Sequence, residues 1–566
     1  MRRYFRYVSI LLVAVLISGV LLTSCTQAEP TTTTATQTTT ATQTTTDTQT
    51  TTATQTTTAT QTSTVTTTAP TSTGPTGDLR IALATFVSAA LDPALSTPGT
   101  AQNILVALFD PVVGLAPNGN PAPGLAESWE ASPDGMTWTF HIRKGVKFHD
   151  GSDLTGTDVK FSIERILDPS ATSTNATKLR GIIDYINLPD PYTVEFHLLK
   201  VDGEFWKWFT AAVGSEGLVV PKKYIEENGA EYFGQKPIGS GPWKLVKYDW
   251  GTYLEAEAVK DHWNTVPDFE RLIMMGVPEE ATRVAMLKTG MADFADIGPD
   301  SVAQLETAGV QVVGIPGALT SDYSISWDLD NPQDYPVGDV RVRKALSLAI
   351  DREELAESLF LGYAQPAAVY YMPPNIYFYD PTILPDPYDT EEAKRLLAEA
   401  GYPDGFDMKL YSLAFAPWHP TLNEAVAGYW RAIGVKVELV AMQYPAFAPL
   451  YRPAPGPGIW GNAASWRSAG VMGFDFTIVY RSTGYLKNVR NAQLDSLIDQ
   501  TEAAIDMEER IRLAREAATL ARDEYVFIAV LFHDALYGMG SRVADWTPIQ
   551  GFAMVGPAYA TMTRAD

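Results

Sequence analysis

The sequence predicts an α/β body of two or three lobes that follows an N-terminal export signal. Segments with strand-like alternation and segments with helical periodicity succeed one another along residues 78–566, which is typical of α/β proteins. This stretch is too long for a single hydrophobic core, and 45% hydrophobic and 11% aromatic residues supply ample core material. No later segment reaches 18 uninterrupted apolar residues, so we expect a soluble body.

The first 24 residues resemble a lipoprotein signal peptide. Arginines within the first six residues precede an apolar run, and small residues then lead to Cys25. Cys25 is the single cysteine of the chain, so it has no internal disulfide partner. The pattern predicts that residues 1–24 are removed and that Cys25 carries the lipid that anchors the protein to the membrane. The alternative is a retained N-terminal membrane helix with an incidental cysteine, for which the apolar run is short.

Residues 25–77 have the composition of a tether. They are dominated by threonine, contain a six-residue repeat that starts as residues 35–40, and have Glu29 and Asp47 as their charges. Without large apolar side chains such a segment cannot bury enough surface to offset chain entropy. We therefore expect a disordered linker, which O-linked sugars could decorate.

The body contains strand and helix patterns in alternation. Helix 390–399 has clear ends, since Asp389 supplies an N-cap, acids follow in the first turn, and Gly401 comes after the last turn. Residues 133–135 form a turn signal between two strands. We expect strands at residues 79–83, 137–142, 193–198 and 435–439, and helices at residues 157–167, 281–288, 340–361, 390–399, 422–432 and 491–524.

Composition and motifs argue against several functions. The formal net charge is −24, and an acidic body repels nucleic-acid phosphates. The chain has no nucleophile elbow, His-Glu-x-x-His pair, Walker loop or dinucleotide-binding glycine pattern, so we expect no enzyme activity and no cofactor. The six histidines are too far apart in sequence for a preformed zinc site. We expect a monomer without a nucleic-acid partner.

Several long motifs nevertheless occur in a fixed order. They span residues 91–93, 121–129, 132–140, 143–152, 157–162, 238–243, 339–352, 393–405 and 433–437. Together they resemble the family 5 extracellular solute-binding proteins, the peptide and nickel receptors of ABC importers. The resemblance implies a two-lobe periplasmic-binding-protein-like fold (type II, class C), which closes on a solute and presents it to permease subunits. We interpret His149 and the glycine-rich residues 239–242 within these motifs as architectural.

The resemblance also implies a division of the body. The first lobe is expected at about 78–112, 237–325 and 528–566, with an extra subdomain on it at about 113–236. The second lobe is expected at about 326–527. The chain then crosses between the lobes twice, and solute binding is a hinge closure that needs no covalent chemistry.

One departure from the family bears on the solute. Peptide receptors of this family carry an acid in a Trp-Gly-Ala-Asp-Tyr type segment, where it pairs with the α-ammonium of the peptide. Here the segment that begins at Trp460 lacks the acid and continues to Ser465, Trp466 and Arg467. An aromatic ring beside an arginine suits a sugar-like or anionic solute, although a packed tryptophan beside a surface arginine is an equal alternative. Asp475 could restore the acid.

Further candidates for solute contact are aromatic. Phe86 follows the first strand, Trp327 follows a strand-like run, and Trp418 precedes a helix; each of them could instead belong to the core. A peptide, a non-peptide solute such as a sugar or an anion, and a nickel chelate all remain open. Outside the family, an anchored surface hydrolase and an adhesion module would also fit a tethered body.

Overall fold

The computed structural model divides the chain into two compact units, Met1–Thr73 and Gly74–Asp566. In the first unit it describes the backbone of two strands. In the second unit, the body, it describes residues 74–84, 90–95, 100–173, 175–326, 335–370, 372–374, 376, 378–413, 419–442, 458–461, 480–482, 490–550 and 556–565. All the hydrophobic core clusters of the described residues lie within the body. The body therefore has the cores that it needs to fold by itself.

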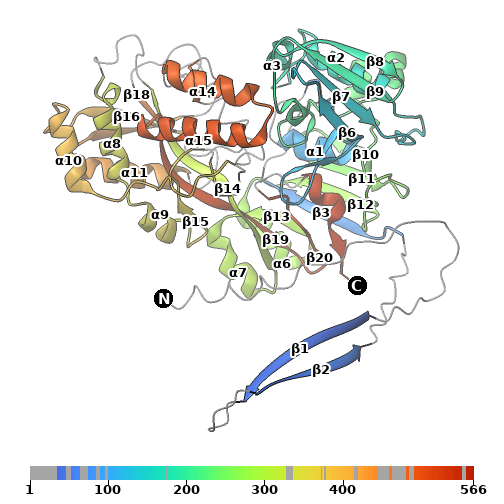
Figure 1. Ribbon diagram of the computed structural model, residues 1–566, viewed down its shortest axis with the longest axis horizontal. Helices are drawn as coiled ribbons and strands as arrows, with labels where there is room; N and C mark the ends of the chain where they lie inside the picture. The colour runs from blue at the N-terminus through green and yellow to red at the C-terminus, as the bar shows by residue number, and fades with distance from the viewer. Residues whose placement is uncertain are drawn as a thin grey trace. The chain divides into compact units, whose positions relative to one another are not determined.

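A single eleven-stranded sheet runs through the body (Figure 1). The strands follow one another in the order β10 (Trp243–Asp249), β11 (Tyr253–Ala258), β12 (Arg271–Gly276), β3 (Asp78–Leu83), β13 (Phe294–Ile297), β19 (Phe527–Met539), β14 (Gln311–Ser326), β18 (Gly458–Gly461), β16 (Asp407–Leu413) and β17 (Lys436–Met442), while β15 (Ala364–Pro366) pairs with β19. The strands β10 to β13 belong to the first lobe, and β16 to β18 belong to the second. The two long strands β14 and β19 pair antiparallel and join the lobes.

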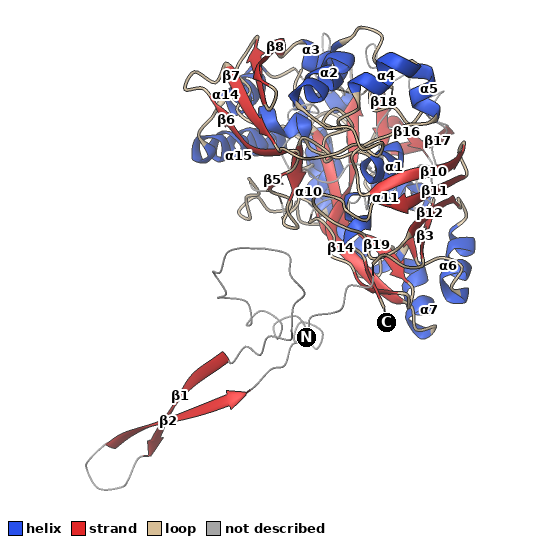
Figure 2. Ribbon diagram, turned by 90° about the vertical axis from the view of Figure 1, so that its right-hand side faces the viewer, coloured by secondary structure: helices blue, strands red, loops and turns tan. Residues whose placement is uncertain are grey.

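Helices cover this sheet in both lobes (Figures 1 and 2). The first lobe has α1 (Thr100–Leu108), α6 (Glu280–Thr289) and α7 (Val302–Thr307). The second lobe has α8 (Val340–Leu348), α9 (Arg352–Ser358), α10 (Thr390–Glu399) and α11 (His419–Ala432), and also the pair α14 (Ala492–Ala503) and α15 (Met507–Asp523). Smaller elements are β20 (Val543–Asp545), β21 (Thr563–Arg564) and the 3-10 turns Pro299–Ser301, Pro336–Gly338 and Gly556–Thr561.

An extra subdomain lies between β3 and β10 in the chain. After the short pair β4 (Val113–Leu115) and β5 (Pro121–Pro123), it forms a separate four-stranded sheet in the order β6 (Ala126–Ala131), β7 (Thr137–Ile142), β9 (Thr193–Leu198) and β8 (Ile183–Asp190). Its helices are α2 (Gly156–Leu167), α3 (Ala176–Arg180), α4 (Lys222–Asn228), α5 (Ala230–Gln235) and the 3-10 turn Phe205–Phe209. Its core is aromatic: Phe140 meets Phe209 edge-on at 5.4 Å between ring centroids.

The predicted strands and most predicted helices are confirmed. Two predicted helices are wrong in length, because each is in fact two helices. The segment 340–361 breaks at Asp351, whose side chain accepts a hydrogen bond from the backbone N–H of Glu354 and so caps α9. The segment 491–524 breaks in the same way at Asp506, which caps α15 through the N–H of Glu509. An internal aspartate can start a new helix where the apolar periodicity continues.

His149 and the glycine-rich bend are architectural, as predicted. The backbone N–H of Gly239 donates to Nδ1 of His149 at 3.1 Å, and Nε2 of His149 donates to the carbonyl of Gly241 at 2.9 Å. A Cβ at Gly239 would lie 1.9 Å from the backbone oxygen of Leu108. The bend needs glycine because it packs on α1. The two hydrogen bonds of His149 connect the extra subdomain to this bend.

The structure describes two strands within residues 25–77, the segment that we expect to be a disordered linker. β1 (Ala35–Thr45) and β2 (Ala53–Ser63) form an isolated antiparallel pair, in which Gln37 lies opposite Gln61 and Gln43 opposite Gln55. β-branched threonine favours extended backbone, and the six-residue repeat keeps like residues in register. An isolated two-stranded sheet is at best marginally stable in water. Cys25 and residues 1–24 lie outside the described residues.

Candidate functional site

The parallel strands of the first lobe, β3 and β13, end at the position of Gly314 on β14. β13 pairs with β3 in parallel, and Ile297 at the end of β13 lies opposite Leu536 of β19. Gly314 of β14 also lies opposite Leu536. The carboxyl ends of β3 and β13 are therefore level with Gly314 and point along β14 toward the second lobe.

The parallel strands of the second lobe end nearby and point the other way. β18 runs antiparallel to β14, with Trp460 opposite Ser324, and parallel to β16, with Gly461 opposite Ser412. The carboxyl ends of β16, β17 and β18 are therefore level with Asp322 and Tyr323. The carboxyl edges of the two lobes face each other along residues 314–323 of β14. Ligands of open α/β sheets bind outside the carboxyl ends of their strands, so this is the candidate solute site.

The sequence-predicted site residues can be placed against these edges only through the strands that precede them. Phe86 follows β3, Trp418 follows β16, and Ser465, Trp466 and Arg467 follow β18, so their segments begin at the facing edges; Asp475 is further along the last of these segments. Trp327 instead follows Ser326, which pairs with Gly458 at the opposite end of β18. Trp460 lies within β18, where the backbone alone is described. All the others lie outside the described residues.

Sequence reasoning missed a buried polar run on β14 between the two edges. The side chains of Thr320, Ser321 and Asp322 are at most 1% exposed, and none of their oxygen atoms makes a hydrogen bond to a described group. Burial raises the pKa of Asp322 well above its ordinary value, and the nearby Tyr370 side chain offsets only part of this rise. The sequence signal that could have revealed this run is an acid within Thr320-Ser321-Asp322, immediately before a strand-like segment.

The strand β19 contributes two further titratable side chains to the same stretch. Asp534 accepts a hydrogen bond from the N–H of Gly317 at 3.0 Å, while burial raises its pKa to about 6. His533 is stacked on Phe360 at 4.8 Å between ring centroids. Burial, with a contribution from His419 at the start of α11, lowers the pKa of His533 to about 3. At neutral pH this imidazole is therefore uncharged.

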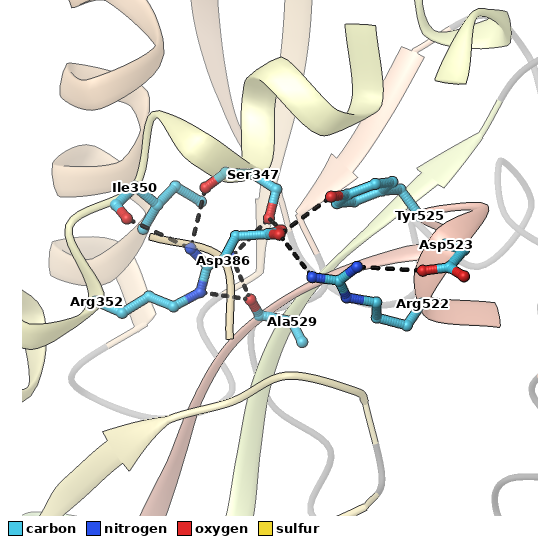
Figure 3. Close-up of polar contacts among 8 residues, drawn as sticks. All are labelled: Ser347, Ile350, Arg352, Asp386, Arg522, Asp523, Tyr525 and Ala529. Carbon is cyan, nitrogen blue, oxygen red and sulfur yellow. Dashed lines mark hydrogen bonds and ion pairs between the residues drawn. The ribbon is translucent and has the colours of Figure 1, made fainter. Parts of the chain in front are cut away.

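A buried arginine network fixes β19 at the level of Asp322 (Figure 3). Arg352 donates from Nε and Nη2 to the carbonyl of Ala529 at 3.0 and 2.8 Å, and Ala529 is the residue of β19 opposite Asp322. Nη2 also donates to Oγ of Ser347 at 2.8 Å, and this hydroxyl donates to Asp386 at 2.6 Å. The family-like motif at residues 339–352 thus positions the strand.

The lobes also meet away from the sheet, where the extra subdomain contacts α14 and α15 (Figure 1). The N–H of Gly203 donates to the carbonyl of Glu502 at 2.8 Å. Arg510 of α15 forms an ion pair with Glu204 at 3.2 Å, with both side chains less than a tenth exposed. Lys207 lies 3.6 Å from Asp202 and 3.9 Å from Glu204. We call these five residues, Asp202, Gly203, Glu204, Lys207 and Arg510, the interlobe latch.

The described part of the body has neither a cluster of metal ligands nor a membrane-spanning helix. There, no three histidine, cysteine or acidic side chains gather into a group that could hold a metal ion. Within the same residues, no helix has the length and apolar character needed to cross a bilayer.

Comparison with known proteins identifies the fold and the family. A family model described as bacterial extracellular solute-binding proteins, family 5 Middle, matches residues 120–485. The chain belongs to this family. Its members are extracytoplasmic solute-binding proteins of ABC importers, and the two-lobe fold expected from the sequence is confirmed.

Named relatives of this family 5 protein bind different solutes. Heme-binding protein A of Haemophilus influenzae is 28% identical over 75% of this chain and 81% of its own. Di/tripeptide-binding protein 3 of Pseudomonas aeruginosa is 27% identical over 81% and 90%, respectively. The solved DppA of Helicobacter pylori, in complex with the peptide STSA, superimposes with a TM-score of 0.73 at 23% identity and covers 87% of this chain and 99% of that one. These relatives are named for binding and not for catalysis.

Proposed function

We propose that this protein is a lipid-anchored receptor that captures a solute between its two lobes and delivers it to the permease of an ABC importer. The observation that carries the proposal is the pair of carboxyl edges that face each other along residues 314–323 of β14. Solutes bind where strands end in this way, and closure of two lobes around a hinge buries them.

The anchor and the domain limits follow from the sequence. In this proposal residues 1–24 are removed, Cys25 carries the lipid, and residues 25–77 hold the solute-binding body, residues 78–566, away from the membrane. The first lobe comprises about 78–112, 237–325 and 528–566 with the extra subdomain at 113–236, and the second comprises about 326–527. The receptor acts as a monomer.

The solute is a small molecule or a short peptide. Relatives named for peptides favour a peptide, whereas the missing acid after Trp460 favours a sugar-like, anionic or chelated solute. In either case we assign contacts to Phe86, Trp418, Trp460, Ser465, Trp466 and Arg467. Trp327 stays a weaker candidate because its segment begins at the opposite end of β18.

Mass spectrometry tests the proposal directly. The body, residues 78–566, is purified without denaturation and then denatured to release any bound small molecule, which is identified and returned to unliganded body in a calorimeter. We expect stoichiometric binding of a solute. If nothing is released, and neither short peptides, sugars nor a nickel–histidine chelate raise the melting temperature, the receptor proposal is wrong.

A further inference from the structure

We propose that Asp322 is a solute-binding residue that receives an ammonium or guanidinium group of the solute. The inference rests on the proposed function, since it places Asp322 in the site between the lobes, and it narrows the solute to organic cations and zwitterions. Three observations carry it: the position of Asp322 on β14, the absence of a positively charged partner for its carboxylate among the described residues, and the aromatic side chains beside it.

The position of Asp322 follows from strand register. Ser324 lies opposite Trp460, so Asp322, two residues earlier, is level with the first residue after β18. The segments after β16, β17 and β18 all begin at this level. The ladder between β14 and β19 is irregular between Ser321 and Asp322. The residue without a partner in this ladder is Val530, so β19 has a bulge at the level of Asp322. Bulges are over-represented beside functional sites.

Asp322 is also unlike the other buried acids of the described residues, each of which has an ion-pair or hydrogen-bond partner in the fold. Arg165 pairs with Asp92, Trp263 with Asp110, Thr155 with Asp158, Trp208 with Asp202, Arg510 with Glu204, Asn175 with Glu216, and Arg542 with Asp293. Asp322 is 0% exposed, yet neither Oδ1 nor Oδ2 accepts a hydrogen bond from a described group. No described lysine, arginine or histidine acts on it. A carboxylate buried without a counter-charge is costly, and a solute cation would remove that cost.

The neighbours of Asp322 favour an organic cation. Tyr370 acts on its carboxyl group, and the ring centroid of Phe527 lies 4.7 Å from that of Tyr370 and 5.1 Å from that of Tyr480. Aromatic faces beside a carboxylate attract ammonium and guanidinium groups. A metal ion would need further ligands, and the described residues offer no group of three acids, histidines or cysteines.

In this proposal Asp322 pairs with the positive group of the solute from β14, as the acid of the family's peptide receptors does from the segment after β18. The chain lacks that acid after Trp460, so a positive group on the solute would lie against a different strand.

The test uses the body, residues 78–566, in three forms: wild type, Asp322→Asn and Glu216→Gln. Glu216 is a matched control, because it is another buried acid whose pKa is raised by burial but which lies in the extra subdomain beside Asn175. Small molecules released from each form are identified by mass spectrometry. The probes trialanine and putrescine, each with its acetylated form that lacks the cation, are then titrated into each unliganded form.

We expect the wild-type solute to contain a basic nitrogen and at least one amine probe to bind more tightly than its acetylated form. Asp322→Asn should weaken this binding by at least about tenfold, and Glu216→Gln should leave it unchanged. The melting temperature of solute-free Asp322→Asn should equal or exceed that of wild type, because the change removes a buried acid. Equal binding by wild type and Asp322→Asn, or a bound solute without a basic nitrogen, would overturn the inference and leave the receptor function intact. If no solute of any kind binds, both proposals fail.

Discussion

Nη1 of Arg510, on α15, lies 3.2 Å from Oε1 of Glu204 in the extra subdomain. The same guanidinium group donates to the carbonyl of Ala504, and Glu204 shares Lys207 with Asp202. Positive and negative charges from two lobes thus neutralise one another in a buried cluster. This contact joins the extra subdomain to α15, so its stability adds to the stability of the arrangement in which the lobes meet.

Gly203→Ala should therefore hold the body open. A Cβ at Gly203 would lie 2.1 Å from the oxygen of Ala504 and 2.3 Å from Nη2 of Arg510, both in the other lobe. We expect a larger radius of gyration by small-angle X-ray scattering and a solute affinity at least about tenfold weaker, because the closed state is less populated. Gly428→Ala is the control, since a Cβ there meets nothing within 4 Å. Scattering curves that coincide for the two variants would show that the latch does not control closure.

The stability of the body should fall in acid partly through His149. Burial lowers the pKa of His149 from 6.5 to about 4, with opposing effects of the Gly241 carbonyl and Asp110 and smaller lowering effects of Lys244 and His262. A histidine with a lowered folded pKa stabilises the fold fully above pH 6.5, and this contribution is lost as the pH falls toward 4.

The measurement is the free energy of unfolding of wild type and His149→Ala between pH 7 and 4. The difference between them should shrink by up to about 1.4 kcal/mol per pH unit below 6.5. His141→Ala serves as control, because the His141 side chain is 43% exposed. A difference that stays constant over this range would contradict the assignment.

Cys25→Ser should release the protein from membranes. The thiol is the proposed lipid acceptor, and acyl chains are what holds such a protein on a bilayer. Cell fractionation measures the result: the exported variant is expected in the soluble fraction and the wild type in the membrane fraction. A variant that stays with the membranes would rule out the lipoprotein interpretation.

Deletion of residues 30–74 should leave folding and solute affinity unchanged. The core clusters lie within the body, and the pair β1–β2 is an isolated sheet. Melting temperature and calorimetric affinity are compared with and without the segment. A loss above about 1 kcal/mol in the free energy of unfolding or of solute binding, which is a clear mutational effect, would mean that the tether packs on the body.

Arg467→Ala should weaken solute binding by about 2–5 kcal/mol, the usual cost of removing one partner of a buried charge pair. Trp466→Ala should cost about 1 kcal/mol through lost stacking. Both variants should keep the wild-type melting temperature without solute. Arg512→Ala is the matched control, since Arg512 pairs with Glu509 and Glu516 on the exposed side of α15. Binding that survives Arg467→Ala would remove Arg467 from the site and make Asp475 the next residue to test.

Much of the fold could be read from the sequence, because its signals are local. The capped helix 390–399 occurs with the bounds expected, and the glycine bend at residues 239–242 packs as closely as glycine allows. Helix breaks at Asp351 and Asp506 were missed because apolar periodicity continues across them.

The site was harder to predict because its parts meet through long-range pairing. Phe86 and Trp418 were identified as aromatic residues beside predicted elements, and the segment after Trp460 through its departure from the family pattern; all of these are local signals. Asp322 gave no such signal, since its significance comes from the partners that it lacks after folding. Glu204 and Arg510 are 306 positions apart in the printed sequence, and no local pattern links them.

The two-stranded connection between the lobes constrains how this protein can change over evolution. Successive residues of a strand face opposite sides, and Tyr323, next to Asp322, packs edge-on against Trp430 on the other face. Deleting one residue between Gly317 and Ser321 would exchange these two faces, placing the acid against the second lobe's core and the tyrosine toward the solute. Selection for new solutes can therefore substitute residues on the face of β14 that contains Asp322, while the length of the strand must stay fixed.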